Sequence, residues 1–305
     1  MNENSSVAII MSTYNGEKWI KEQLDSLINQ TYKNIKIYIR DDGSKDNTLN
    51  ILKEYEKNEN NITIFSGENL GYVKSFFEIL KNVTDCKYYS FCDQDDIWHE
   101  DKVERAVKML DEEENDKALM YFSNYDFYDG DMNFTGHFTG NKKGPSFRNS
   151  LVDVISLGNC IVINDIVRQK MVLSGPEYVF AHDWWAYCIA SGMGKVIYDR
   201  TSTIKYRRHG NNTSNVGMSF ISLQMFRIKK FIFGDYFKVI KKQQLKYYKY
   251  FYEDLPEENK KIMKLFINEK YNFKNALIKT FYPKMFRQTI IDEILIRVMF
   301  LFGRI

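Results

Sequence analysis

The sequence predicts an α/β protein with a mixed, mostly parallel sheet flanked by helices, followed by a helical C-terminal region. Short apolar runs alternate with helical patterns over the first third of the chain, which is typical of parallel strands connected by helices. Polar clusters follow four of these runs, and strand-like patterns stop beyond residue 217. The 305 residues, 44% of them hydrophobic, suffice for one large domain and an appendage.

The first part of the chain contains four predicted strands. Residues 7–11 form a short apolar run, followed by Asn15-Gly16 and by a helical pattern from Trp19 to Ile28. The same order of strand, turn and helix then repeats, with Asp46 placed to cap the second helix. The further strands are expected at 35–39, 62–65 and 88–92, and the further helices at 49–55, 71–83 and 103–110.

The pattern is less regular after residue 110. Strand-like runs cover 119–127 and 158–163, and a helix is predicted to begin at His182-Asp183. The polar segment 129–150 has no clear periodicity and is expected to be a flexible loop or lid. We expect residues 1–217 to form the larger domain, with halves at about 6–125 and 126–217. Residues 218–305 form the helical region.

The composition excludes several classes of protein. A net charge of +3 gives no reason to expect a nucleic-acid partner. The four cysteines form no CxxC pair, which argues against a zinc site and favours a reducing compartment. No apolar run has the length of a signal peptide or approaches the roughly 18 residues of a membrane-spanning helix. We expect a cytoplasmic protein, either soluble or peripheral on the inner face of the cell membrane.

The charge is unevenly distributed. Residues 219–305 contain 18 Lys and Arg against 8 Asp and Glu, so the rest of the chain is acidic. The stretch 226–233 interleaves Lys and Arg with Phe and Ile, and basic amphipathic helices bind anionic membranes. Peripheral contact with an anionic membrane, a solvated helical appendage and an oligomer interface all fit this pattern.

Polar clusters follow the four predicted strands of the first part. In α/β sheets ligands bind beyond the carboxyl ends of the strands, so these clusters should meet at one edge. The chain has no GxGxxG and no GxxxxGK[ST], so the phosphates of a ligand would need another source of positive charge. The clusters are Thr13-Tyr14-Asn15, Asp41-Asp42, Asn69 and Asp93-Gln94-Asp95-Asp96.

The acidic cluster at 93–96 favours a metal site. Its three carboxylates repel one another unless a cation is present, and Mg²⁺ binds a few protein oxygens together with phosphate oxygens and water. A solvated acidic turn is the simple alternative. An EF-hand is excluded because Ile97 and Trp98 stand where that loop needs a ligand and a glycine.

The Asp41-Asp42-Gly43-Ser44 segment has two interpretations. Asp-Gly pairs favour turns, so it could simply connect a strand to a helix. At a strand end, however, its carboxylates could accept the imide N–H of uracil or thymine, or the ribose hydroxyls. Tyr14 on the neighbouring loop could stack on the base or pack internally.

In this order, the motifs resemble the family 2 glycosyltransferases, which implies a GT-A fold. The Asp-Gln-Asp-Asp-Ile-Trp sequence, followed by Asp101-Lys102, is similar to the bacterial rhamnosyltransferase branch in particular. The resemblance covers about residues 6–215, so the 6–125 half would bind the nucleotide sugar and the 126–217 half the acceptor. The segments that carry it are 12–16, 41–48, 69–71 and 91–98.

The resemblance implies a donor site and a metal site. Asp95, of the DXD motif, and His209, in the closing segment 206–212, would hold Mg²⁺ or Mn²⁺; a plain basic loop is the alternative for His209. Lys74 matches a position that is often basic in relatives. The implied donor-binding residues are Thr13, Tyr14, Asn15, Asp41, Asp42, Lys74, Asp93, Gln94, Asp95, Arg207 and Arg208.

The resemblance also implies a catalytic base. The family usually has a Glu-Asp or similar pair at the start of a helix, and this chain has His182-Asp183 at that position. Asp183 is therefore the expected base, with helix capping as the alternative, while the histidine departs from the family pattern. Acceptor contacts are implied for Asp96, Trp98, Trp184 and Trp185, although the Trp pair could equally belong to the core.

The implied reaction is inverting transfer of L-rhamnose from dTDP-L-rhamnose to a hydroxyl of a growing surface polysaccharide on a lipid carrier. A UDP-hexose or UDP-galactofuranose donor is the alternative within the family. A sugar nucleotidyltransferase would need an N-terminal glycine-rich phosphate loop, which the segment 12–16 is not. A non-catalytic sugar-nucleotide or membrane-binding module would not need both Asp183 and His209.

Overall fold

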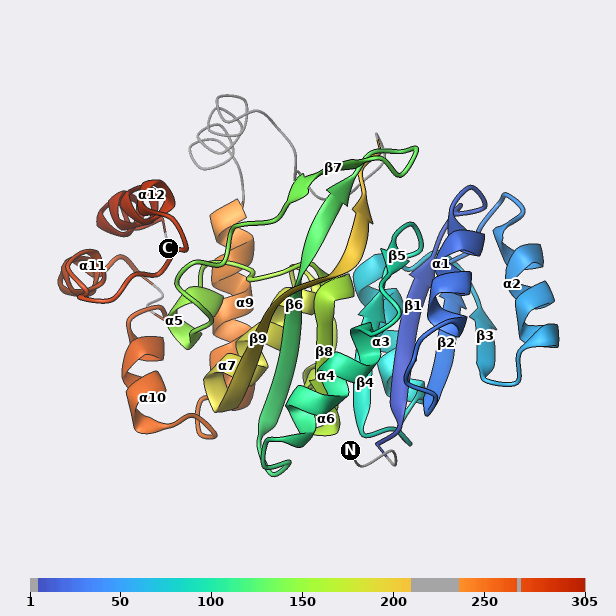
Figure 1. The fold of residues 1–305 in the computed structure, drawn as a ribbon. Coiled ribbons are helices and arrows are strands. Elements are labelled where there is room, and N and C mark those ends of the chain that lie inside the picture. Colours follow the sequence, from blue (N-terminus) through green and yellow to red (C-terminus); the bar gives the residue numbers. More distant parts are fainter. Residues whose placement is uncertain (1–4, 210–235, 268–269, 305) are drawn as a thin grey trace.

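A single mixed sheet forms the centre of the computed structural model, which describes residues 5–209, 236–267 and 270–304 (Figure 1). Its strands are β1 (Val7–Thr13), β2 (Ile35–Asp41), β3 (Ile62–Ser66), β4 (Tyr88–Cys92), β5 (Ile97–Trp98), β6 (Ala118–Tyr128), β7 (Phe134–His137), β8 (Ile161–Asn164) and β9 (Gly194–Arg207). Their order is β3-β2-β1-β4-β8-β6-β9-β5, and β7 pairs with β6.

Parallel pairing dominates the first half of the sheet. β1 pairs in parallel with both β2 and β4, and β2 pairs in parallel with β3. β8 is antiparallel to β4 and β6, while β9 is parallel to β6. The predicted class, a mixed α/β sheet with flanking helices, is confirmed, but parallel pairing predominates only in its first half, because β5–β9 and β6–β7 are also antiparallel.

Helices cover both faces of the sheet. Alternate residues of β1 explain the two layers, because Ile9 belongs to the hydrophobic core on one face and Ile10 to the core on the other. The helices before the C-terminal region are α1 (Ile20–Ile28), α2 (Thr48–Asn58), α3 (Tyr72–Asn82), α4 (Lys102–Asp111), α5 (Phe147–Ser150), α6 (Asp165–Ser174) and α7 (His182–Met193), with a 3₁₀ turn, η1, at Gly158–Cys160.

The segment 129–150 contains regular structure, contrary to the expectation of a loop. It includes β7, which pairs with the end of β6, and the short helix α5, which is capped by Ser146. The long strand β9 was not predicted, because charged and polar residues interrupt its short apolar run at 196–198.

The C-terminal region is helical and packs onto the larger domain. Trp185 of α7 lies edge-on to Tyr247, with ring centroids 5.8 Å apart, and both belong to one core. No helix in the described part of the chain is long and apolar enough to cross a membrane. The stretch 226–233 and residues 210–212 of the closing segment lie outside the described residues. The helices are α9 (Tyr236–Phe251), α10 (Glu257–Lys264), α11 (Phe273–Thr280) and α12 (Ile290–Leu301).

Candidate functional site

A cavity of about 620 Å³ lies where the loops after β1, β2, β3 and β4 meet. The four polar clusters therefore converge as the sheet topology requires. The end of β9 contributes a fifth wall. The lining residues are Ser12, Tyr14, Asn15, Trp19, Asp42, Asn69, Gly71, Tyr72, Asp93, Gln94, Asp95, Tyr206 and His209.

The loops after β1 and β4 are joined by the Gln94 side chain. Its amide oxygen accepts a hydrogen bond from the Tyr14 backbone N–H at 2.9 Å, and its amide nitrogen donates to the Tyr14 carbonyl at 3.2 Å. A Cβ on Gly16 would lie 2.4 Å from that amide oxygen, so a larger residue there would displace the Gln94 amide from Tyr14. The Tyr14 ring itself is 43% exposed, which leaves it available to stack on a planar ligand.

The two carboxylates at the end of β2 differ in their position relative to the cavity. Asp41 is buried and accepts hydrogen bonds from Thr13 Oγ1 and from Ser44, so Thr13 and Asp41 fix the loop and do not line the cavity. Asp42 does line it. Its carboxylate accepts the backbone N–H groups of Leu70 and Gly71 and forms an ion pair with buried Arg40.

Replacing Asp42 with alanine should therefore destabilise the protein. The change leaves the Arg40 guanidinium buried without its partner and frees the two N–H groups of the 69–71 loop, at a cost of about 3–5 kcal/mol in the free energy of unfolding. Asp85→Ala is the matched control, because its ion pair with Lys36 is exposed and worth less than about 1 kcal/mol. Urea denaturation of the two variants measures the difference; equal stabilities would contradict the structural role of Asp42.

Asp93 and Asp95 are acidic residues that line the cavity. Burial raises the pKa of Asp93 to about 7, and the negative charges of Asp95 and Asp183 contribute to this increase. Asp95 Oδ2 lies 2.8 Å from His209 Nε2, and the imidazole stacks on the Trp19 ring at a centroid distance of 5.5 Å. The carboxylate and imidazole are thus held together by residues from three separate segments.

This pair fits a divalent cation that shares its shell with a diphosphate. A carboxylate oxygen and a neutral imidazole nitrogen are both ligands of Mn²⁺, and carboxylate oxygen also suits Mg²⁺. No group of three or more His, Cys, Asp or Glu side chains with metal-binding geometry exists in the described residues. A cation held by this pair would complete its shell with phosphate oxygens and water.

The two arginines of the closing segment occupy structural positions. Arg207 is buried; its Nε donates to the Asp95 carbonyl at 3.0 Å, and its guanidinium pairs with Glu22 and lies over the Trp19 ring. Arg208 stacks on Phe127 at 3.8 Å from the ring centroid. Neither guanidinium group lines the cavity, so donor binding by these two arginines remains a prediction. Arg207 holds the Asp95 loop in place.

Asp183 lies at the start of α7, beside the donor cavity. Its Oδ1 accepts the Trp184 backbone N–H at 2.6 Å, and its charge acts on Asp93 and Tyr72, which line the cavity. Burial raises the pKa of Asp183 to about 6. A half-buried carboxylate with this pKa is ionised at neutral pH and is still basic enough to accept a proton.

His182 is enclosed by aromatic rings. Its imidazole stacks on Phe76 at 3.9 Å between centroids and lies edge-on to Phe91 at 4.6 Å. Burial lowers the pKa of His182 to about 3, so the ring is neutral at physiological pH. A Cβ on Gly158 would lie 2.8 Å from its Nε2, which explains a glycine at the η1 turn. Because the His182 ring is neutral, Asp183 is the charged side chain in the first turn of α7.

The residues expected to contact an acceptor belong to the interior. The Trp184 and Trp185 indoles are buried and donate to Ser150 O and Ser174 Oγ, so neither can stack on a sugar. Asp96 is buried and accepts from Asn159 and from the Arg207 backbone N–H. These assignments are corrected to packing roles.

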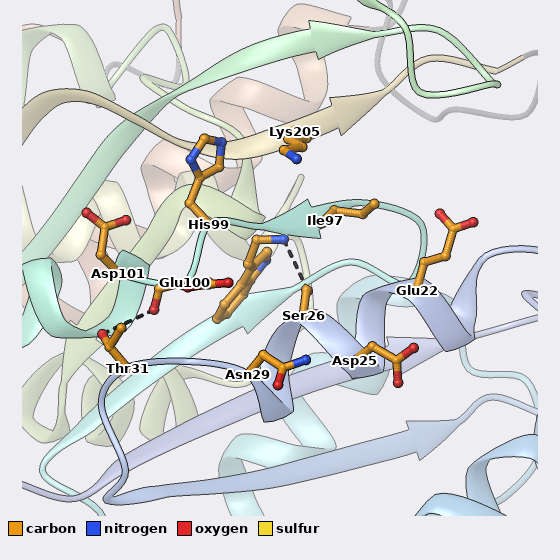
Figure 2. Close-up of a pocket in the computed structure, with 11 residues that line it drawn as sticks. Glu22, Asp25, Ser26, Asn29, Thr31, Ile97, His99, Glu100, Asp101 and Lys205 are labelled. Atoms are coloured by element: carbon orange, nitrogen blue, oxygen red, sulfur yellow. Dashed lines mark hydrogen bonds between the residues drawn. The ribbon is translucent and has the colours of Figure 1, made fainter.

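Trp98 and Lys74 also lie away from the donor cavity. Trp98 is buried beneath the Lys102 ammonium, which lies 3.6 Å from its ring centroid. It borders a second, open cavity of about 700 Å³ between α1 and β5, shown in Figure 2 with Glu22, Asp25 and Asp101 around it. This cavity contains none of the motif residues expected to bind the donor. Lys74 is exposed on α3 and does not line the donor cavity.

Sequence reasoning missed two aromatic residues of the cavity. Trp19 was assigned to the apolar side of a helix, but it precedes α1 and supports His209. Tyr72 follows the Asn69-Leu70-Gly71 motif, is 48% exposed and lines the cavity near Asp183. The position of Tyr72 directly after that motif was the available signal.

Comparison with known proteins agrees with this geometry. The model of Glycosyl transferase family 2 matches residues 8–173. A dTDP-rhamnosyl transferase, RfbG, of Shigella flexneri is 33% identical over 228 residues, which cover 69% of this chain and 75% of the relative. An uncharacterized glycosyltransferase of Haemophilus influenzae is 30% identical, with 69% and 68% covered.

Solved structures with little sequence similarity share the fold. TarS 1–349 of S. aureus, in complex with UDP-GlcNAc, has a TM-score of 0.60 at 16% identity, with 98% of this chain and 79% of that chain covered. The mannosyltransferase PcManGT of Pyrobaculum calidifontis, in complex with GDP-Man and Mn²⁺, has a TM-score of 0.55 at 16% identity, with 86% and 69% covered. The motifs, the GT-A type of sheet and the family match lead to one conclusion: the chain belongs to glycosyltransferase family 2.

Proposed function

We propose that this protein is an inverting glycosyltransferase that transfers L-rhamnose from dTDP-L-rhamnose to a hydroxyl of a growing surface polysaccharide on a lipid carrier. The observation that carries the proposal is the placement of Asp183 beside a cavity that is lined by Asp95 and His209. One carboxylate thus serves the acceptor side, and a metal-binding pair serves the diphosphate side. The proposed place of action is the cytoplasm, at the inner face of the cell membrane.

Asp183 would act as the general base. Its carboxylate accepts the proton of the acceptor hydroxyl as that oxygen attacks the anomeric carbon, which contributes about 10²- to 10⁴-fold to the rate. Because this single carboxylate flanks the reacting carbon on the acceptor side, the displacement occurs in one step. A β-linked donor then gives an α-L-rhamnoside.

Asp95 and His209 would hold Mg²⁺ or Mn²⁺. The bound cation would neutralise the negative charge that develops on the leaving diphosphate. The stacking of His209 on Trp19 and the Arg207 bond to the Asp95 carbonyl keep both ligands in position. Tyr14 supplies an exposed ring in the lining of the cavity, on which a thymine or uracil base would stack.

The choice of donor rests on sequence similarity. The relative from Shigella flexneri is named a dTDP-rhamnosyl transferase, whereas the structural neighbours were solved with UDP-GlcNAc or GDP-Man. The test is donor hydrolysis by the purified protein with Mn²⁺, across dTDP-L-rhamnose, UDP-hexoses, UDP-galactofuranose and GDP-mannose. Preference for dTDP-L-rhamnose supports the proposal. Preference for a UDP-sugar would contradict the donor assignment and leave the family unchanged.

The rate should depend on pH through Asp183. Burial raises the pKa of this carboxylate to about 6, and a base is active only when ionised, so kcat should fall as the pH drops below 6. His182 stays neutral over this range because its pKa is about 3. A pH profile of kcat at saturating donor and metal measures the effect, and a rate that is flat between pH 7 and about pH 5 would contradict the assignment.

A further inference from the structure

An unusual concentration of exposed apolar side chains marks the C-terminal helices. In the described residues, more than half of the large apolar side chains that are exposed lie between Tyr271 and Phe302. α11 and α12 contact each other and lie at the end of the molecule opposite α2 (Figure 1). Patches of this kind mark surfaces that bind a partner or a membrane.

Helix α12 is apolar on two opposite sides. At 100° per residue, Ile296 and Phe300 point to one side, where they pack in the core; Phe300 lies 5.1 Å from Phe286 between ring centroids. The other side is exposed, including Ile290 at 70% and Ile294 at 58%. It consists of Ile290, Ile291, Ile294, Val298 and Leu301.

The outward side is held rigidly by the inward one. Glu293 is buried, and its carboxylate accepts the Phe286 and Arg287 backbone N–H groups at 2.8 Å each. Arg287 in turn forms an ion pair with Asp153 and donates to the Val152 carbonyl. The exposed apolar stripe therefore has a fixed orientation relative to the sheet.

The exposed charged side chains of the segment itself are of one sign, while the exposed Glu258 of α10 lies 3.8 Å from Lys284. Every exposed charged side chain in the described segment 270–304 is basic: Lys270, Lys274, Lys284 and Arg304. The two acids of the segment, Asp292 and Glu293, are buried. A small depression beside Tyr271 is also lined by Lys241, Lys270 and Lys279, with no carboxylate among its lining residues.

We propose that the outward surface of α11 and α12, formed by the apolar stripe of α12, Phe273, Ile278, Phe281 and the four exposed basic residues, docks on an anionic lipid bilayer. Apolar side chains enter the interface of the bilayer while neighbouring lysines contact anionic head groups. α12 has 12 residues and a length of about 18 Å, which is too short to span a hydrocarbon core of about 30 Å. It therefore lies along the surface.

Segment 270–304 has no exposed carboxylate among its described residues, which favours a membrane over a second copy of the chain. A two-fold contact would bring this surface against itself and oppose like charges. Arg287 and Asp153 also connect α12 to the acceptor half, so docking would bring that half to the membrane. Only the benefit of bringing the acceptor half to the membrane rests on the proposed function, because that function places a lipid-linked acceptor at the membrane.

The test is flotation of the full chain with vesicles of phosphatidylcholine, alone or mixed with phosphatidylglycerol. We expect binding to the mixed vesicles and little to the neutral ones. Ile290→Ser with Ile294→Ser should weaken binding at least about tenfold. Lys270→Gln with Lys274→Gln should weaken it about thirtyfold. Leu173→Ser, at another apolar side chain that is 68% exposed, and Lys53→Gln with Lys57→Gln on α2 are matched controls and should bind normally.

Three outcomes would overturn the inference. Wild-type protein could fail to float with the anionic vesicles, or all variants could float equally. Alternatively, sedimentation equilibrium could show a dimer that the Ile290→Ser, Ile294→Ser variant loses while vesicle binding is unchanged, which would assign the surface to a second copy. Donor hydrolysis, measured on the same samples in solution, reports on the proposed function separately. Thermal unfolding of each variant checks the fold.

Discussion

Asp183→Asn should abolish transfer while the donor still binds. The amide keeps the size of the side chain and its hydrogen-bond acceptor for the Trp184 N–H, but it cannot take a proton from the acceptor hydroxyl. We expect kcat to fall about 10²- to 10⁴-fold, with the donor dissociation constant changed by less than about threefold. Single-turnover transfer and titration calorimetry measure the two quantities.

A matched control separates base catalysis from a helix-end effect. Asp165 lies in the first turn of the neighbouring helix α6, as Asp183 does in α7, so Asp165→Asn removes the same charge from an equivalent position. It should leave kcat unchanged. A near-normal rate for Asp183→Asn, or an equal loss in both variants, would refute the base assignment.

Asp95→Ala should remove the metal dependence of donor binding. The change deletes one of the two side chains proposed to hold the cation and leaves His209 without its 2.8 Å partner. Loss of an outer-shell partner costs about 10- to 100-fold in metal affinity, so loss of a direct ligand should cost at least about a hundredfold. Titration of the donor with and without Mn²⁺ measures this loss.

The control for Asp95 is a similar pair elsewhere in the molecule. Asp126 lies 2.7 Å from His137 between β6 and β7, away from the cavity. Asp126→Ala should bind donor and Mn²⁺ like the wild type. Donor binding by Asp95→Ala that still responds to Mn²⁺ as the wild type does would show that the metal is held elsewhere.

The sequence predicted the place of the site better than the roles of individual side chains. Apolar runs at β1 and β4 defined parallel strands, so Tyr14 and Asp95 had to lie at the same edge of the sheet. Whether a carboxylate at that edge faces ligand or protein depends on distant residues. Asp96 turns inward because Asn159, 63 residues away, and the Arg207 N–H, 111 residues away, hold its carboxylate.

Helix α7 illustrates a second limit. Its sequence is apolar on all sides, so periodicity could not show which face of the helix is buried. Trp184 and Trp185 are therefore open to two interpretations from the sequence, whereas in the structure Tyr247 of α9 packs on Trp185, and Trp184 donates to the Ser150 carbonyl. Asp183, the polar residue that precedes them, is directed toward the cavity side.

The most direct test of the proposed mechanism is the stereochemistry of the product. NMR spectroscopy of the linkage formed from dTDP-β-L-rhamnose and an oligosaccharide acceptor gives the anomeric configuration. A single displacement with Asp183 as the base predicts an α-L-rhamnoside. A β-L-rhamnoside would show retention, and it would contradict a mechanism in which one carboxylate on the acceptor side drives the displacement.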